Sequence, residues 1–286
     1  MSNLEKINIY VPEHIGNSLD NDATMFEVFK RDGQTINRNR FLSMLILGYH
    51  NSYVEECSSA YNDVKKLLSK GGLDSSTQHE IADGILKNVV LPQVPSRKGK
   101  NPAKLSLKPT KETEGLLLGL IYNIGIEDSI SQYLCRLLMS YCEKPIYERE
   151  RIIFKQKVEF LESACKSKRE ISFTTVFNPG LIHHVIPYEL THGPEERFNY
   201  LLGQEYNKKL QRTKAVSYRL CRIQTPSFCL SSGSIDDEVA RHLEQTKKYG
   251  PAYAINEDTE TCVRLSERGQ QNFRVIYFGR PIVDRK

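Results

Sequence analysis

Arginine and tyrosine, two side chains that bind nucleic acids well, are interleaved through residues 200–222 of this chain. An arginine offers a phosphate a planar fork of hydrogen-bond donors, and a tyrosine ring stacks on any base for about 1–3 kcal/mol. Between residues 204 and 223 the only acid is Glu205. The cations there are Lys208, Lys209, Arg212, Lys214, Arg219 and Arg222, and the neighbouring tyrosines are Tyr200, Tyr206 and Tyr218. This mixture favours a single-stranded nucleic acid as the ligand.

A second basic segment lies between residues 96 and 111, which include no acid. Its cations are Arg97, Lys98, Lys100, Lys104, Lys108 and Lys111. The net charge of the whole chain is only +5, so the placement of the charges says more about partners than their sum does. Two such segments predict a polyanionic partner, although each is also compatible with a solvated loop or strand edge.

Two short stretches alternate polar and apolar residues, as half-buried strands do. In residues 6–11 the outward residues are Lys6, Asn8 and Tyr10, and the inward ones are Ile7, Ile9 and Val11. In residues 104–108 the outward residues are Lys104, Ser106 and Lys108. A proline closes each strand, and two helical segments with apolar periodicity follow it. We therefore expect one small unit, a strand and two helices, to occur twice, over residues 1–52 and 98–145.

The second helices of the two units match residue by residue. Phe41, Leu42, Leu45, Ile46, Leu47 and Tyr49 fall opposite Tyr133, Leu134, Leu137, Leu138, Met139 and Tyr141. The unit resembles the ribbon-helix-helix fold, in which two copies pair their strands into an antiparallel ribbon that enters the major groove. Asn39 and Ser131 are the expected N-caps of these helices. The helix start at Asn39 and Arg40 is the expected phosphate contact.

Three arrangements of this region remain open. The two strands pair within one chain, or residues 1–52 pair with the same segment of a second chain and leave residues 104–108 as a loop. In the third arrangement the amino terminus is an ordinary helical domain whose first strand pairs elsewhere. The first copy also holds more residues between Pro12 and Gly33 than the resemblance requires, and we expect a turn there.

The regions around these units are predicted by periodicity. Residues 53–97 read as a helical connector with a basic linker, and residues 146–170 as a charged spacer helix with an apolar seam from Ile152 to Cys165. Short strands then follow, over 171–177, 183–188, 198–206 and 215–223, and predict a small barrel over 171–232.

Residues 233–286 read as a separate α/β module that contributes to dimerisation. It begins with a helix over 236–249 that Ser234 caps, and strands follow at 252–256, 261–265 and 273–278. The predicted fold class is α+β with several domains.

Residues 171–223 resemble a WYL domain, a small barrel related to the Sm and SH3 folds and named for a Trp-Tyr-Leu run. The run here is Asn199-Tyr200-Leu201, so the tryptophan is absent. The segment His184-Val185-Ile186-Pro187-Tyr188 resembles the family's basic-Val-x-Pro strand. The segment Tyr218-Arg219-Leu220-Cys221-Arg222-Ile223 resembles its Phe-Arg-Leu-Asp-Arg-Ile strand, with Cys221 in place of the Asp. The resemblance implies a basic pocket for nucleic acid or a nucleotide-like ligand, formed by His184, Tyr188, Tyr200, Arg212, Arg219 and Arg222.

Strand geometry complicates the role of the two arginines in that pocket. Strict alternation places Arg219 and Arg222 on opposite faces of a regular strand. Either a bulge lies between them or only one of them serves the pocket. The alternative is a structural ion pair with one of the nearby acids, Glu189, Glu195, Glu196 or Glu205.

The residues that carry catalysis in enzymes do not form a recognisable pattern in this sequence, so we expect a protein that is not an enzyme and uses no cofactor or metal. His183 and His184 would point to opposite sides of a strand, and a metal site there would need an acid or thiolate partner from elsewhere. The run Ser231-Ser232-Gly233-Ser234 lacks the Gly-x-Ser-x-Gly turn of a nucleophile. The seven cysteines include no Cys-x-x-Cys pair and are expected to be reduced in a cytoplasmic protein without a membrane span.

Together the two resemblances lead to two functional hypotheses. A ribbon-helix-helix unit with a WYL barrel resembles the WYL accessory proteins of type VI-D CRISPR systems, which implies a homodimer that binds single-stranded RNA and enhances an RNA-guided RNA nuclease, its effector partner. The same pairing resembles transcriptional repressors, which implies binding to operator DNA through Lys6, Asn8 and Tyr10 and a barrel that senses a nucleotide-like ligand.

Overall fold

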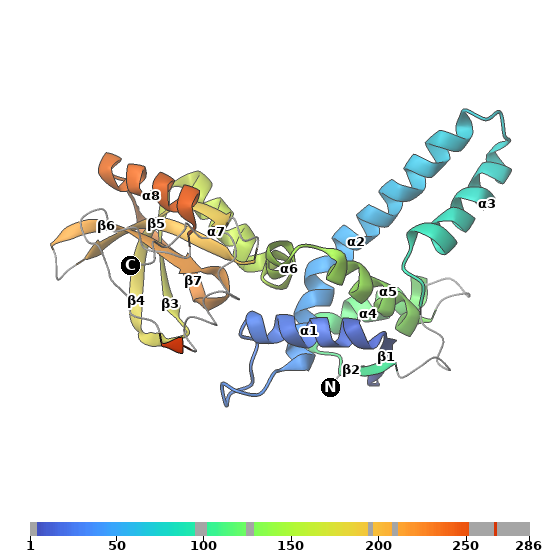
Figure 1. Cartoon of the computed structure of the whole chain (residues 1–286), viewed down its shortest axis with the longest axis horizontal. Coiled ribbons are helices and arrows are strands. Elements are labelled where there is room, and N and C mark those ends of the chain that lie inside the picture. Colours follow the sequence, from blue (N-terminus) through green and yellow to red (C-terminus); the bar gives the residue numbers. More distant parts are fainter. Residues whose placement is uncertain are drawn as a thin grey trace.

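The computed structural model describes residues 5–94, 102–123, 129–193, 197–207, 211–251 and 266–267. Two regions of different construction are joined through a short helix, α6 (Ile146–Ile153), as Figure 1 shows. The amino-terminal region is mostly helical and surrounds a two-stranded ribbon, and the carboxy-terminal region is built on a five-stranded sheet. The expected α+β class is therefore confirmed.

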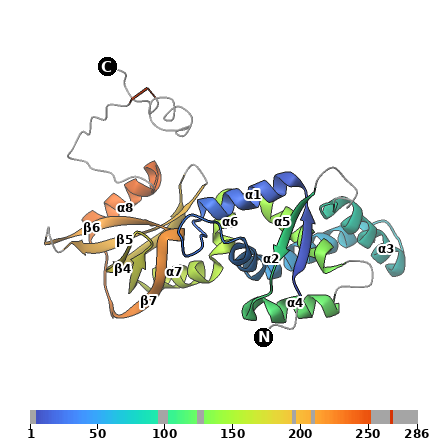
Figure 2. The same cartoon turned by 90° about the horizontal axis from the view of Figure 1, so that it is seen from below.

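The ribbon pairs two strands that are far apart in sequence. Strand β1 (Ile7–Val11) runs antiparallel to β2 (Ala103–Leu107), and the register runs from Ile7 opposite Leu107 to Val11 opposite Ala103. Figure 2 shows the two strands side by side. Pairing within one chain, one of the three arrangements that the sequence left open, is confirmed.

Helices cover one face of the ribbon, because every second residue of each strand is apolar. Ile9, Val11, Leu105 and Leu107 are buried against α1 (Glu13–Met25), α2 (Arg38–Ser69), α4 (Lys111–Asn123) and α5 (Ile130–Glu143). The matched residues of α2 and α5 form the centre of this core, where Tyr141 makes edge contacts with Phe41 and Tyr49. Neither unit could bury these residues alone, and together they close one core.

Helix α2 continues far beyond this core and forms an arm with the next helix. After Gly71 and Gly72 the chain reverses into α3 (Ser75–Ile85), which ends in a π-helical turn, η1 (Leu86–Val90). The sequence predicted a separate connector helix from residue 53. No glycine or proline interrupts residues 49–70, so the core helix and the connector are one helix.

The predicted spacer over 146–170 is two helices. Helix α6 ends at Ile153, and α7 (Lys155–Ser167) begins after Phe154, whose ring contacts Phe26 edge-on at 6.5 Å. The apolar side of α7, which includes Val158, Leu161 and Ala164, is buried against the sheet. Because its own chain covers this seam, the seam is not a free surface for a second chain.

The sheet consists of five antiparallel strands in the order β6-β5-β4-β3-β7. They are β3 (Arg169–Thr175), β4 (Asn178–His192), β5 (Asn199–Asn207), β6 (Arg212–Arg219) and β7 (Ile223–Ser232), with a 3-10 turn, η2 (Leu220–Arg222), before the last. Among the described residues β6 and β7 do not pair. The expected closed barrel is therefore wrong, and the region is an open sheet whose edges are β6 and β7.

Two helices cover opposite faces of the sheet (Figure 2). Helix α7 lies on the face that carries Ile171, Phe173 and Val185, and α8 (Asp237–Tyr249) packs Val239 and Leu243 on Leu202 of the other face. Helix α8 thus belongs to the sheet region, and its N-cap is Asp236, not the expected Ser234. The strands expected at 252–256, 261–265 and 273–278 lie outside the described residues.

Two further expectations concern membrane-spanning helices and the state of the cysteines. No helix in the described part is long and apolar enough to cross a membrane. The six cysteines within the described residues are all free thiols, and burial raises the pKa of most of them, for example of Cys142 to about 11. A raised pKa keeps those thiols protonated, so they pack as small apolar side chains.

Candidate nucleic-acid interface

The outer face of the ribbon brings together all six residues that the sequence assigned to it. The register places Asn8 opposite Ser106 and Tyr10 opposite Lys104, and the Ser106 hydroxyl donates a hydrogen bond to the Asn8 side-chain oxygen at 3.1 Å. The cations of this face, Lys6, Lys104 and Lys108, are exposed. The alternation of the two strands therefore produces a polar surface with three lysines on a support held rigid by the core.

Asn39 and Ser131, the expected N-caps, have a different role. The caps lie two residues earlier: Asn37 accepts from the Arg40 amide at 3.1 Å, and Ser129 forms a capping box with Gln132. The misassignment has a simple cause. The first helix start has an asparagine at both 37 and 39, the second has a serine at both 129 and 131, and either residue type is a preferred N-cap.

Asn39 and Ser131 instead connect each unit to the strand of the other. The Asn39 side chain donates to the Lys108 carbonyl and accepts from the Lys108 amide at 2.7 Å, and the Ser131 hydroxyl donates to the Asn8 carbonyl at 2.8 Å. Because both polar atoms of Asn39 are used by Lys108, Asn39 is not the expected phosphate contact. Arg40 is exposed beside it and remains a candidate.

Arg219 and Arg222, predicted to bind a ligand on the sheet, both contact the amino-terminal region. Arg222 Nε lies 2.9 Å from Glu27 Oε1, Arg219 Nη1 lies 3.9 Å from the same atom, and Arg219 also donates to the Met25 carbonyl. Each guanidinium also covers an aromatic ring, Arg219 that of Phe198 at 3.4 Å and Arg222 that of Phe177 at 4.6 Å. The two arginines therefore form a structural ion pair, but the acid is Glu27 and none of the four nearby acids that the sequence offered.

Local backbone geometry explains how one carboxylate reaches both arginines. The 3-10 turn η2 interrupts the strand between them, so the strict alternation that would have separated them does not apply. Glu27, two residues after the end of α1, has a φ of 57°. This value is uncommon for a residue with a side chain and persists only where the surroundings hold it. The hydrogen bond from Arg219 to the Met25 carbonyl is one such constraint.

The other four residues predicted to bind on the sheet do not meet at one place. His184 is exposed on β4, Arg212 is exposed at the start of β6, and the Tyr188 hydroxyl donates to Glu244 of α8. Tyr200 lies opposite Arg219 and Thr191. Since Thr191 is seven residues from His184 along β4, Tyr200 and His184 are separated by about 20 Å. The single basic pocket that the resemblance implied is therefore wrong for this set.

His183 and His184 face opposite sides of β4, as the sequence predicted. The His183 ring stacks on Phe173 and its Nδ1 lies 2.9 Å from Glu205, whereas His184 is 60% exposed on the other face. The Tyr218 hydroxyl donates to the same Glu205 carboxylate at 3.0 Å, and burial raises the pKa of this tyrosine well above its usual value. Glu205 thus ties β4 to β6, and it also lies 3.7 Å from Lys214 Nζ.

Two buried polar residues that the sequence did not single out hold the sheet to α6. The backbone amide and the side-chain amide of Asn199 both donate to Glu150, at 2.6 and 2.9 Å. Burial raises the pKa of Glu150, and these two donors act in the opposite direction. Asn199 occupies the place of the absent tryptophan. The one signal in the sequence for this buried contact was the polar side chain of Asn199 at a position where the family has an apolar ring.

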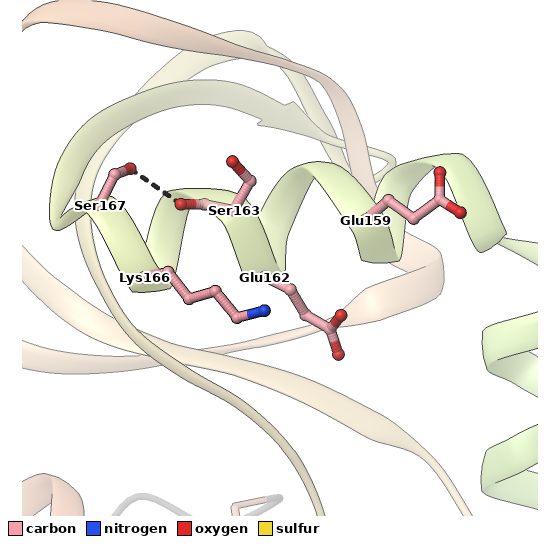
Figure 3. Close-up of a pocket in the computed structure, with 5 residues that line it drawn as sticks. All are labelled: Glu159, Glu162, Ser163, Lys166 and Ser167. Carbon is pink, nitrogen blue, oxygen red and sulfur yellow. Dashed lines mark hydrogen bonds between the residues drawn. The ribbon is translucent and has the colours of Figure 1, made fainter.

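A shallow depression of about 570 Å³ lies on the outer side of α7 (Figure 3). It is lined by Glu159, Glu162, Ser163, Lys166 and Ser167. Its walls come from a single helix, and the Ser167 hydroxyl is already bonded to the Ser163 carbonyl at 2.8 Å. None of the predicted site residues reaches it, so it does not contribute to the interface.

Comparison with solved structures finds the same fold elsewhere. A structure described as "Crystal structure of a CRISPR Cas-related protein" matches with a TM-score of 0.67 and 18% identity, over 98% of this chain and 80% of that one. The proteasome accessory factor B/C (PafBC) of Arthrobacter aurescens matches with a TM-score of only 0.23 and 12% identity, over 46% of this chain and 22% of that one, and supports no argument. No family model and no curated protein matches the chain. At 18% identity the first likeness shows a common fold alone.

Proposed function

We propose that this chain is a non-enzymatic regulator that binds nucleic acid and works with a CRISPR system. The observation that carries the proposal is the outer face of the ribbon, where Lys6, Lys104 and Lys108 surround Asn8, Ser106 and Tyr10. A two-stranded ribbon fits the major groove, and amide and lysine side chains there can contact base edges and phosphates. The CRISPR Cas-related protein that shares the fold supports the choice of system.

The second contact, for single-stranded RNA, lies at the end of the sheet where β5 ends and β6 begins. Tyr206 is 52% exposed there, and Arg212 and Lys214 are exposed on the neighbouring strand. Tyr206 shares a face of this hairpin with its register partner Thr213, and Arg212 and Lys214 lie on the other face, where Lys214 is 3.7 Å from Glu205. We expect a base to stack on the exposed ring while the backbone of the strand crosses the end of the hairpin to reach Arg212. RNA held at this end would let the chain act on an RNA-guided RNA nuclease and enhance it.

A transcriptional repressor is the second candidate, and the Glu27 contact favours it. The carboxylate of Glu27 occupies the position that the phosphate of a nucleotide-like ligand would take between Arg219 and Arg222. Such a ligand would displace Glu27 and release the segment that follows α1, a helix packed in the core beneath the ribbon. Ligand binding on the sheet would then change DNA binding by the ribbon.

Affinities of the full chain for single-stranded RNA, single-stranded DNA and duplex DNA at one salt concentration separate these candidates. Lys104→Glu with Lys108→Glu should weaken duplex binding more than about tenfold and lower the salt slope by about 0.9 for each phosphate that the protein no longer neutralises. Arg212→Glu should weaken only RNA binding. Lys248→Glu, which changes an exposed lysine of α8, is the matched control. Equal weakening in all variants would mean diffuse attraction and would contradict the proposal.

The oligomeric state stays a separate prediction. We expect a homodimer, since two copies on one nucleic acid strand would gain avidity. Light scattering at low micromolar concentration tests this, and a mass near the 32.9 kDa of one chain would contradict it.

A further inference from the structure

Three side chains with metal-binding chemistry meet on the outer face of the sheet. Glu170 of β3, His184 of β4 and Cys229 of β7 come from three adjacent strands, and their ligand atoms all lie within 4.8 Å of one another. A metal site at His184 needed an acid or a thiolate from elsewhere in the chain. The sheet supplies both.

Strand register explains the meeting. Ser172 of β3 lies opposite His184 on one side and opposite Ser227 on the other. Glu170 is two residues before Ser172 and Cys229 is two residues after Ser227, so all of them face the same side of the sheet. An irregularity in pairing next to Glu170 shifts its strand relative to β7. The opposite side of these strands is the buried core against α7.

The two distances from His184 match those of a tetrahedral zinc ion. His184 Nδ1 lies 3.7 Å from Cys229 Sγ and 3.3 Å from Glu170 Oε1. Usual zinc bond lengths at tetrahedral angles separate a nitrogen from a sulfur ligand by about 3.6 Å, and a nitrogen from an oxygen ligand by about 3.4 Å. The third pair, Glu170 and Cys229, lies within 4.8 Å, so side-chain rotation of these half-buried residues would close the site around an ion.

We propose that Glu170, His184 and Cys229 bind one Zn²⁺ ion per chain. A thiolate, an imidazole and a carboxylate together select zinc over Mg²⁺ or Ca²⁺, which prefer sets of oxygen ligands. Three protein ligands leave the fourth position to water or to a donor from a partner. The half-buried Glu170 and Cys229 and the exposed His184 give the ion access from solvent.

The neighbours of the ligands support this assignment. The Ser231 hydroxyl donates to Oε2 of Glu170, which leaves Oε1 directed at His184, and such outer contacts orient ligands in known metal sites. Arg169 donates to the Cys229 carbonyl at 3.3 Å, which holds the backbone of β7 in place beside the thiol. Bound zinc would tie the edge strand β7 to β3 and β4.

Metal titration of the full chain tests the proposal. Protein purified in chelator should bind one equivalent of Zn²⁺, and Co²⁺ should produce a thiolate-to-metal absorption band together with the strong visible bands of tetrahedral cobalt. Cys229→Ser should abolish the thiolate band and weaken zinc binding at least tenfold, and His184→Ala should weaken it similarly. Cys57→Ser and His14→Ala, which change residues far from the cluster in sequence and outside it, should behave like the parent.

Thermal melting distinguishes loss of the site from loss of the fold. Without metal, Cys229→Ser and the parent should melt alike, because Cys229 is only half-buried. Zinc should raise the melting temperature of the parent and leave that of Cys229→Ser unchanged. The proposal is overturned if the parent binds no more zinc than Cys229→Ser does, or if the cobalt complex lacks the thiolate band. Neither result depends on nucleic-acid binding.

Discussion

The ribbon and the sheet carry similar basic and aromatic residues, yet the tertiary structure uses them differently. On the ribbon the lysines are exposed on one face and the core beneath holds them in place. On the sheet the two arginines that the sequence marked most strongly are engaged with Glu27 and with aromatic rings of their own chain. A cation in a recognisable motif is thus available for a ligand only where the rest of the chain leaves it without an acid or where the ligand displaces that acid.

The largest expected effect is the loss of stability when a charge is placed in the core beneath the ribbon. Leu107 is completely buried, so Leu107→Lys places a charge without a partner in the core and should lower the free energy of unfolding by more than about 4 kcal/mol. Urea denaturation measures the change. Lys104→Gln, on the exposed side of the same strand, should stay within about 0.5 kcal/mol of the parent. Parent-like stability of Leu107→Lys would contradict the paired ribbon.

The second largest expected effect on stability comes from substitution of a glycine where the two regions meet. A Cβ on Gly48 of α2 would lie 2.1 Å from the Ile152 carbonyl oxygen of α6, so Gly48→Ala must push the two helices apart and should destabilise the chain by about 1–3 kcal/mol. Gly119→Ala in α4 is the matched control. A Cβ there meets nothing within 4 Å, and alanine should stabilise that helix by up to about 1 kcal/mol. If the melting temperatures of both variants change in the same direction relative to the parent, the close contact at Gly48 is refuted.

Removal of the Glu27 charge tests whether this acid keeps the arginines of the sheet from binding a ligand. Glu27→Gln keeps the size of the side chain but removes the charge that faces Arg219 and Arg222. We expect a decrease of about 1–2 kcal/mol in stability, together with a gain in affinity for phosphate-bearing ligands on the sheet. Glu13→Gln, at an exposed position of α1, is the control. If both variants bind such ligands equally, Glu27 does not compete for that site.

The smallest effect concerns a buried acid at the base of the amino-terminal region. Burial raises the pKa of Asp22 to about 6, although Arg149 at 2.9 Å and the Tyr141 hydroxyl at 3.0 Å act in the opposite direction. An acid with a higher pKa in the folded state binds protons more readily there, so its contribution to stability is full below the unfolded pKa and is lost as the pH rises through about 6.

The pH dependence of unfolding tests this sign. From about pH 7 to about pH 5 the parent should gain about 1 kcal/mol in the free energy of unfolding relative to Asp22→Asn, which cannot titrate. Denaturant titrations of both proteins at the two pH values give the difference. A parallel dependence in the two proteins would mean that Asp22 titrates normally.

Local patterns determined the parts of this protein that depend only on neighbouring residues. The period of two in residues 6–11 and 104–108 determined which residues form the outer face of the ribbon, and the matched apolar positions of α2 and α5 determined the core. Both follow from the geometry of strands and helices. The opposite orientations of His183 and His184 were predictable for the same reason.

Contacts between distant residues decided the rest. Glu27 reaches Arg222 across 195 positions and Asn39 reaches Lys108 across 69, and no local period carries such information. The 3-10 turn between Arg219 and Arg222, the open edge of the sheet and the meeting of Glu170, His184 and Cys229 likewise depend on how strands align after the chain has folded. A residue's type follows from the sequence, but its partner depends on which distant surfaces pack together and exclude water.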